Sequence, residues 1–144
     1  MKIRFEKCLD KGQIIRIKID PELVEKELLE SQNDIDSAKK SVKEKNYKWA
    51  IIQTYYSMFH ALKGLLLSKG YREKSHICLR HAIEAIFVDT NLLSEDIFED
   101  YDFARRARER ADYSFIYDEQ LAIDMLESAD KLINEVEGLF IPTN

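Results

Sequence analysis

Residues 47–70, YKWAIIQTYYSMFHALKGLLLSKG, are the most apolar stretch of the chain and decide its fold. At about 100° of rotation per residue, the large apolar side chains cover well over half of a helix circumference. Such a helix must be contacted by several others, so we expect it at the centre of a bundle. Its aromatic residues are interpreted as core rather than as a base-stacking platform. They are Trp49, Tyr55, Tyr56 and Phe59.

The remaining stripe of this helix is small and polar, with Gln53, Ser57, His60 and Gly64 in register. A glycine inside a helix costs roughly 1 kcal/mol relative to alanine. Gly64 therefore predicts the close approach of another backbone.

Capping residues divide the rest of the chain into further helices. Asp20-Pro21 predicts a helix over 21–45, and Ser75 one that runs to about residue 88. Ser94 and Asp118 predict the last two helices, over 94–113 and 118–138. The segment YREKS, from residue 71 to 75, is interpreted as a connection.

The N-terminal residues 1–19 form a separate arm. FEKCLDKG is either a short helix that ends at Gly12, which we favour, or the first arm of a hairpin. Ile15, Ile17 and Ile19 alternate with basic residues, which indicates an extended segment. The predicted fold is a single all-α domain over 1–144, with the arm at 1–19. An antiparallel up-and-down bundle of about five helices then occupies 20–138.

The totals restrict the function. The 144 residues carry a formal net charge of -5, so a protein that coats nucleic acid through its overall field is excluded. Cys8 and Cys78 lie far apart in sequence, which favours reduced thiols. No apolar run has the length of a signal peptide or a membrane span, so we expect a cytoplasmic protein with no membrane contact.

Arginines cluster in the segment ARRARERADY, residues 104–113. The alanines share the side that should face the bundle. On a helical wheel, Tyr101, Arg105, Arg108 and Asp112 fall on one adjoining stripe, away from Arg106 and Arg110. Two interpretations stay open. Arg108 pairs with Asp112 on a solvated border, or Arg105 and Arg108 capture a phosphate at the edge of a cleft.

The segment AIIQTYYSMFHALKGLLLSKG, the KSH of residues 74–76 and the RERADY of residues 108–113 together resemble the HEPN domain family (higher eukaryotes and prokaryotes nucleotide-binding). The similarity is to its small stand-alone prokaryotic branch with a YYxMFHA signature. The resemblance implies a helical bundle that dimerises near an arginine motif. It also implies a minimal nucleotidyltransferase as partner in toxin and antitoxin pairs. Several branches of the family are metal-independent ribonucleases that use an arginine followed, after four to six residues, by a histidine.

This chain departs from that motif, because Tyr113 stands where the histidine belongs when Arg108 is aligned with the motif arginine. Tyrosine, with a pKa of about 10, is a poor general base at neutral pH. The catalytic candidates are Arg108, Tyr113 and His60. His60 is either a satisfied polar group or a substitute for the motif histidine that faces the arginines.

Lys74 and His76, at the start of a predicted helix, are candidates for anion binding, although a plain helix cap explains them as well. The histidines, acids and cysteines lack the paired spacing of a di-iron or zinc site, so no metal and no cofactor are expected. We expect a homodimer that binds nucleotide or single-stranded RNA through Arg105, Arg108, Asp112, Tyr113, Lys74 and His76. The alternatives are an active metal-independent ribonuclease that uses another histidine, and a non-catalytic dimeric interaction module.

Overall fold

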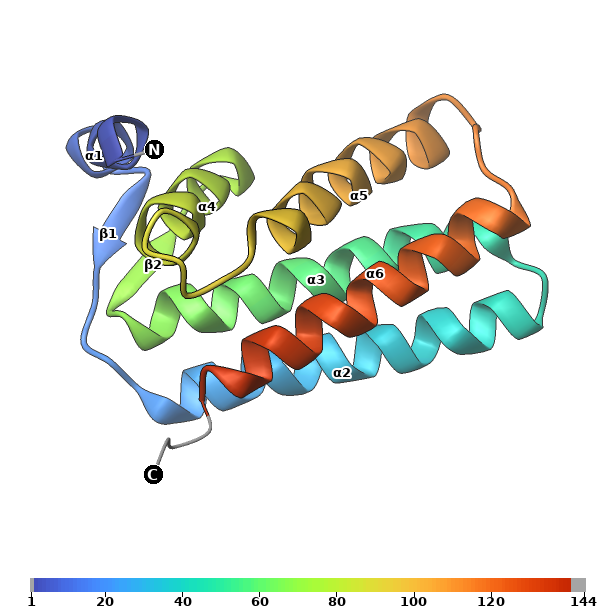
Figure 1. The fold of residues 1–144 in the computed structure, drawn as a ribbon, viewed down its shortest axis with the longest axis horizontal. Coiled ribbons are helices and arrows are strands. Elements are labelled where there is room, and N and C mark those ends of the chain that lie inside the picture. The colour runs from blue at the N-terminus through green and yellow to red at the C-terminus, as the bar shows by residue number, and fades with distance from the viewer. Residues whose placement is uncertain (1, 141–144) are drawn as a thin grey trace.

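The computed structural model describes residues 2–140 and confirms the prediction of an all-α helical bundle (Figure 1). A π-helical turn, η1, continues the fourth helix. The elements in chain order are α1 (Lys2–Asp10), β1 (Ile14–Arg16), α2 (Pro21–Lys43), α3 (Tyr47–Ser68), β2 (Tyr71–Glu73), α4 (His76–Ile83), η1 (Glu84–Val88), α5 (Glu95–Tyr113) and α6 (Glu119–Gly138).

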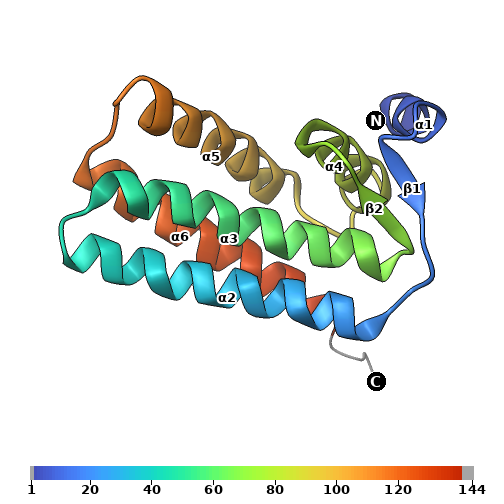
Figure 2. The ribbon, with the colours of Figure 1, turned by 180° about the vertical axis from the view of Figure 1, so that it is seen from behind.

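Helix α3 is the centre of the bundle, as its apolar sequence predicts. It packs against α2, α6, α5 and α4, and also contacts β2. Helices α2, α3 and α6 run along the long axis of the molecule, and α5 lies over α3 (Figures 1 and 2). Helix α4 packs against α3 near one end of the molecule, and α1 packs against α4, η1 and β1 (Figure 1). The side chains of Ile51, Met58, Leu62 and Leu66 are fully buried in this core.

The predicted caps are present at four helix starts. The side chain of Asp20 accepts a hydrogen bond from the amide of Glu22, and Pro21 is the first residue of α2. Ser75, Ser94 and Asp118 each accept a hydrogen bond from the backbone amide of the third residue of α4, α5 and α6, respectively. These bonds satisfy amides that a helix start leaves without an intrahelical partner.

The small polar stripe of α3 faces α2. Ser31 Oγ of α2 donates a 2.6 Å hydrogen bond to the carbonyl oxygen of Ser57 in α3. At Gly64, a Cβ would lie 3.1 Å from the Leu28 side chain, so a leucine occupies the space above this glycine. The element that approaches at Gly64 is α2, since Cβ of Glu27 would also lie 3.7 Å away, and the space of the missing side chain is taken by Leu28.

The N-terminal arm contains the short helix and the extended segment that were predicted. Strand β1 pairs antiparallel with β2, with Ile14 opposite Glu73 and Arg16 opposite Tyr71. The prediction that residues 71–75 are only a connection is wrong, because the first three form this strand. Three residues are too few to show a periodic pattern.

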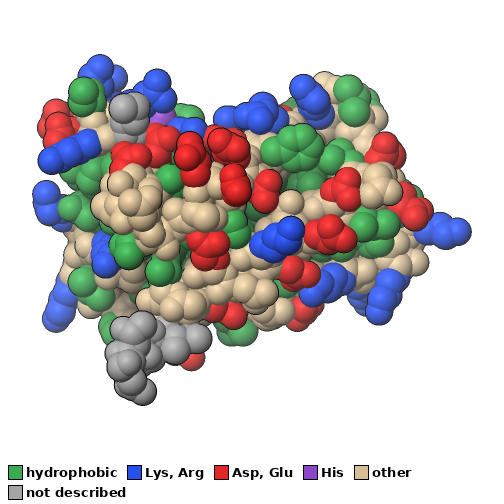
Figure 3. Space-filling view, in the orientation of Figure 1, with side chains coloured by type: hydrophobic (Ala, Val, Ile, Leu, Met, Phe, Trp, Pro, Cys, Tyr) green, Lys and Arg blue, Asp and Glu red, His purple; other side chains and the backbone are tan. Residues whose placement is uncertain are grey.

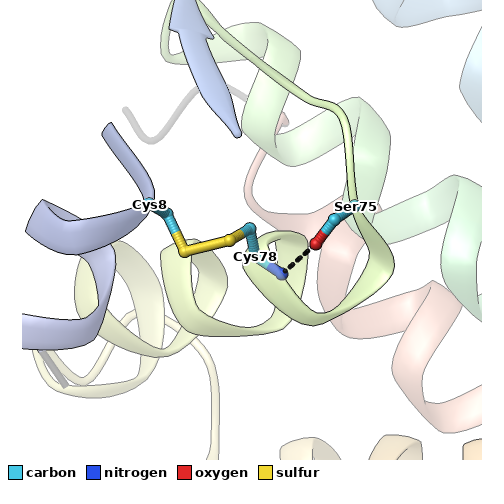
Figure 4. The surroundings of a disulfide bond; sticks show 3 residues. All are labelled: Cys8, Ser75 and Cys78. Carbon is cyan, nitrogen blue, oxygen red and sulfur yellow. Dashed lines mark hydrogen bonds between the residues drawn. A yellow bond between two sulfur atoms is a disulfide. The ribbon is translucent and has the colours of Figure 1, made fainter. Parts of the chain in front are cut away.

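The prediction of reduced thiols is also wrong, since Cys8 of α1 and Cys78 of α4 form a disulfide (Figure 4). The two residues are 70 positions apart in sequence, and their Cα atoms lie 5.8 Å apart. The β1–β2 pairing turns the chain so that α1 lies on α4, which the spacing of the cysteines does not reveal.

The surface charge is uneven along α5. Acidic side chains gather over the junction of α4 and α5, and Lys and Arg side chains lie over the remainder of α5 (Figure 3). Within residues 2–140, no helix is both long enough and apolar enough to cross a bilayer.

Candidate anion-binding site

Arg108 of α5 is turned towards α3. Its Nη2 donates a 3.2 Å hydrogen bond to the hydroxyl of Tyr56 and lies 3.4 Å from Asp112 Oδ2. The guanidinium carbon is 5.5 Å from the ring centroid of Tyr56 and 5.8 Å from that of Tyr113. The predicted Arg108–Asp112 ion pair is thus present, and it holds the guanidinium among aromatic rings.

Arg105 lies one turn earlier on the same side of α5. Its side chain is 28% exposed, compared with 21% for Arg108, and its Nη1 is 3.9 Å from Glu109 Oε1. The Nε atoms of Arg105 and Arg108 are both buried and have no hydrogen-bond partner within residues 2–140. The two arginines therefore bring donor groups to α3 that the described residues do not fully use.

His76, the first residue of α4, joins this group from the other side. Its Nδ1 lies 2.9 Å from the hydroxyl of Tyr55, and its ring stacks on Phe59 at 4.2 Å between centroids. Burial lowers the pKa of His76, and the charge of Arg108 lowers it further. His76 therefore favours the neutral imidazole, in which one ring nitrogen can accept a proton.

Two buried tyrosines connect α3 to α5 beneath these cations. The hydroxyls of Tyr55 and Tyr101 are 3.4 Å apart, and their rings stack at 5.8 Å. Burial raises the pKa of both hydroxyls; the charges of Arg108 and Arg105 partly oppose this at Tyr55. Both tyrosines are therefore protonated near neutral pH and can donate hydrogen bonds.

His60 belongs to a different cluster. Its Nδ1 is 2.6 Å from Glu27 Oε2, and its Nε2 is 3.7 Å from Asp34 Oδ2. The hydrogen bond with Glu27 raises the pKa of His60, although burial opposes it. Lys63 Nζ lies 3.6 Å from the other oxygen of Glu27. His60 is thus turned towards α2, as a satisfied polar group, and does not face the arginine stripe.

The other predicted residues lie at the edges. Tyr113 is 71% exposed and shares a hollow of about 560 Å³ with Arg106, Arg108 and Arg110. Arg105 does not line this hollow. Lys74 is exposed, and its amide donates a 2.8 Å hydrogen bond to the carbonyl of Gln13.

The structure brings together Arg105, Arg108, Asp112, Tyr113 and His76, and adds Tyr55 and Tyr56. Both of these tyrosines were predicted to lie in the core. The prediction is correct for Tyr55, whereas Tyr56 is only partly buried and also binds Arg108 through its hydroxyl. Their hydroxyls, at adjacent positions in an otherwise apolar helix, are the signal that identifies them. Trp49, also predicted to lie in the core, is 52% exposed, so that prediction is wrong.

Within residues 2–140, no group of three or more histidine, cysteine, aspartate or glutamate side chains is placed to hold a metal ion. The arrangement instead offers cations, hydroxyl donors and one neutral imidazole. Cations and hydroxyl donors of this kind can form hydrogen bonds with an oxyanion.

Residues 24–139 match the model of the HEPN domain. This chain belongs to the HEPN domain family. A curated relative, "Putative toxin MJ0142" of Methanocaldococcus jannaschii, is 30% identical over 101 residues. That alignment covers 70% of this chain and 68% of the relative. "Putative toxin MJ0605" of the same organism is 26% identical over 114 residues, 72% of this chain and 85% of the relative.

Two solved structures have the same fold. An archaeal HEPN homologue, ST0689, superposes with a TM-score of 0.63 at 22% identity. The superposition covers 82% of this chain and 98% of the ST0689 chain. TT1696 from Thermus thermophilus gives a TM-score of 0.67 at 20% identity, with 80% of this chain and 96% of its own covered. The bundle is therefore a HEPN fold.

Proposed function

We propose that this HEPN protein binds a phosphate group of a nucleotide or of single-stranded RNA beside Arg108. The observation that supports the proposal is the position of Arg108 itself. Its guanidinium is half-buried, borders a hollow and lies against the hydroxyl of Tyr56. Arginine is planar and always charged, which suits bidentate contact with phosphate oxygens.

The neighbours of Arg108 complete an oxyanion site. Arg105 adds a second positive charge, and His76 and the tyrosine hydroxyls add hydrogen-bond donors. Asp112 balances part of the charge and fixes the Arg108 side chain through their 3.4 Å contact. When phosphate binds, its oxygens would take the place of the Asp112 carboxylate at Arg108. They would also contact the other donors of the site.

Binding of labelled adenosine triphosphate and of single-stranded RNA tests the proposal. We expect Arg108→Ala to weaken binding by about 10- to 100-fold, the loss of one or two charge-assisted hydrogen bonds. Arg72→Ala is the matched control, because it removes an exposed arginine of β2 that does not line the hollow, and it should change affinity by less than about threefold. Equal affinities for wild type and Arg108→Ala would contradict the proposal.

A second candidate is metal-independent cleavage of RNA, with His76 as the proton carrier in place of the missing motif histidine. It is favoured by the lowered pKa of His76 and by the influence of the Arg108 charge on that imidazole. A neutral imidazole can accept the proton of a ribose 2′-hydroxyl while arginine stabilises the charge on the phosphate.

Incubation of RNA with the protein in the presence of a chelator separates the two candidates. The ribonuclease predicts cleavage that His76→Ala abolishes and His60→Gln retains. Tight binding with no product in wild type would leave phosphate binding alone.

The proposed partners are a minimal nucleotidyltransferase, as in a toxin and antitoxin pair, and a second copy of this chain. The relatives named as toxins support the first. The second is supported by a stripe on α5 whose exposed residues follow a helical spacing. These are Asp96, Glu99, Phe103, Arg106 and Arg110.

This stripe is self-complementary. Its acidic residues precede Phe103 and its arginines follow, and Phe103, near the middle of α5, is 49% exposed. Two copies of α5 packed antiparallel about Phe103 would place the acids of each beside the arginines of the other. A two-fold interface needs this kind of surface, because each copy presents the same patch.

A further inference from the structure

The disulfide between Cys8 and Cys78 is the main anchor of α1. Of the residues Lys2–Asp10, Cys8 is the one whose side chain is buried. The helix packs on α4, η1 and β1. Its other contacts are partial: Phe5 lies edge-on to Tyr71 at 5.4 Å between ring centroids, and Leu9 is half-buried. The docking of this helix therefore depends on one covalent bond more than on packing.

The disulfide also lies at a small surface hollow of about 200 Å³, whose accessible surface is mainly apolar and which basic residues border. Both cysteines line it, with Ile77 between the basic side chains. These are Arg4, Lys7, Lys11 and His81, and among the described residues no acid lines the hollow. In a chain with a net charge of -5, this is a local concentration of positive charge.

Two further features make the sulfur of Cys78 a good leaving group. Cys78 is the third residue of α4, and its amide donates to the cap Ser75 at 3.0 Å (Figure 4). A thiolate at a helix N-terminus and beside basic residues is stabilised. His81, one turn later in α4, has a buried Nδ1 with no hydrogen-bond partner within residues 2–140.

We propose that Cys8–Cys78 is a thiol-exchange site for a small anionic thiol, and that its opening releases α1 from α4. In the first step, a thiolate attacks one sulfur, the protein S–S bond breaks, and a mixed disulfide forms while the other cysteine leaves as thiolate. A second small thiol then attacks the mixed disulfide. Two small thiols are oxidised to one disulfide, and both cysteines are reduced to thiols.

Release follows from the size of α1. The helix has nine residues, and isolated helices of this length are marginal in water. Once the bond is open, the partial contacts of Phe5 and Leu9 must hold it alone. We expect the amides of α1 to exchange with solvent much faster, whereas those of α3 keep their protection.

The first experiment compares an anionic thiol, glutathione, with a neutral one, 2-mercaptoethanol, on the folded protein. Reduction is followed by alkylation of the freed cysteines and mass spectrometry. In Lys7→Gln/Lys11→Gln, we expect glutathione to react about two- to fivefold more slowly at low salt. The rate with 2-mercaptoethanol should fall less, because its attacking thiolate carries less negative charge than that of glutathione. The matched control, Lys26→Gln/Lys40→Gln, removes two exposed lysines of α2 and should leave both rates unchanged.

The second experiment measures hydrogen exchange of α1 in oxidised and glutathione-reduced protein. We expect α1 of Cys8→Ser/Cys78→Ser to exchange as fast as α1 of the reduced wild type. Glutathione should not change the exchange of this variant. The inference is overturned if the disulfide opens only in denaturant, or if α1 keeps its protection after full reduction. It is also overturned if the Lys7 and Lys11 variant reacts with glutathione as fast as the control.

Discussion

The Tyr55 hydroxyl lies 2.9 Å from Nδ1 of His76 and joins the middle of α3 to the first residue of α4. Burial keeps Tyr55 protonated, so its hydroxyl can donate to Nδ1 or accept from it, depending on the tautomer of His76. A proton-accepting role for His76 requires the tautomer in which Nδ1 donates to Tyr55 and Nε2 is free. His76 is thereby held beside the Arg108 side of α5. A histidine near the middle of the sequence is thus close enough to Arg108 to feel its charge.

Removal of the Arg108 charge should raise the pKa of His76. The burial of His76 is the larger cause of its lowered pKa, so Arg108→Ala is expected to restore part of the shift and not all of it. Titration of the His76 ring protons by NMR measures the change, with Arg106→Ala as the control. An unchanged His76 pKa in Arg108→Ala would show that the two side chains do not interact.

The His60–Glu27 pair should make stability fall as pH rises. Its hydrogen bond raises the pKa of His60 in the folded state, so the folded protein holds this proton more tightly than the unfolded chain does. The stabilisation is full below an unfolded pKa of about 6.5 and is lost as pH rises through the folded value. We expect His60→Gln to remove this contribution to the change of the free energy of unfolding with pH.

Urea unfolding from pH 5 to 9, for wild type and His60→Gln, measures the effect. The contribution of His81 has the opposite sign, because burial lowers its pKa, as do the charges of Arg80 and Arg4. Its stabilisation is present above the unfolded pKa and is lost as pH falls through the folded value. An identical slope in wild type and His60→Gln would disprove the assignment to His60.

The Arg80–Asp102 pair should stabilise the contact between α4 and α5. Arg80 Nε and Nη2 donate to the two oxygens of Asp102 at 2.6 and 2.7 Å, and both side chains are less than one-fifth exposed. Asp102→Ala is expected to lower the free energy of unfolding by about 2 kcal/mol. In a double-mutant cycle, adding Arg80→Ala to Asp102→Ala should cost less than Arg80→Ala alone. Additive losses would show that the pair is not coupled.

The charge stripe of α5 gives a prediction about self-association. Arg106→Glu/Arg110→Glu should place acids beside acids in an antiparallel α5 pair and shift the protein towards monomer. Adding Asp96→Arg/Glu99→Arg to the same chain reverses both halves of the stripe and should restore association. Sedimentation velocity at several concentrations measures this. A dimer that neither change affects would place the interface elsewhere.

The helices of the bundle were predictable because local signals agree with tertiary contacts. Asp20, Ser75, Ser94 and Asp118 cap where the sequence predicts, and α3 is apolar over most of its surface because it is contacted on most sides. The arginine stripe was predictable from helical rotation, since Ala104, Ala107 and Ala111 fix which side is buried.

The features that escaped prediction depend on which distant segments meet. Strand β2 exists because β1 lies beside it, and the disulfide exists because that pairing carries α1 onto α4. Gly64 admits Leu28, a residue of another helix. The role of His76 follows from the bend between α3 and α4, which no pattern in residues 69–75 specifies.

The β1–β2 pairing has a consequence for synthesis on the ribosome. Residues 14–16 find their hydrogen-bonding partners only in residues 71–73, and Cys8 finds Cys78 later still. Helices α2 and α3 can collapse on each other while the beginning of the chain waits unpaired. Residues 8–16, which precede α2 in the chain, are therefore among the later parts to dock.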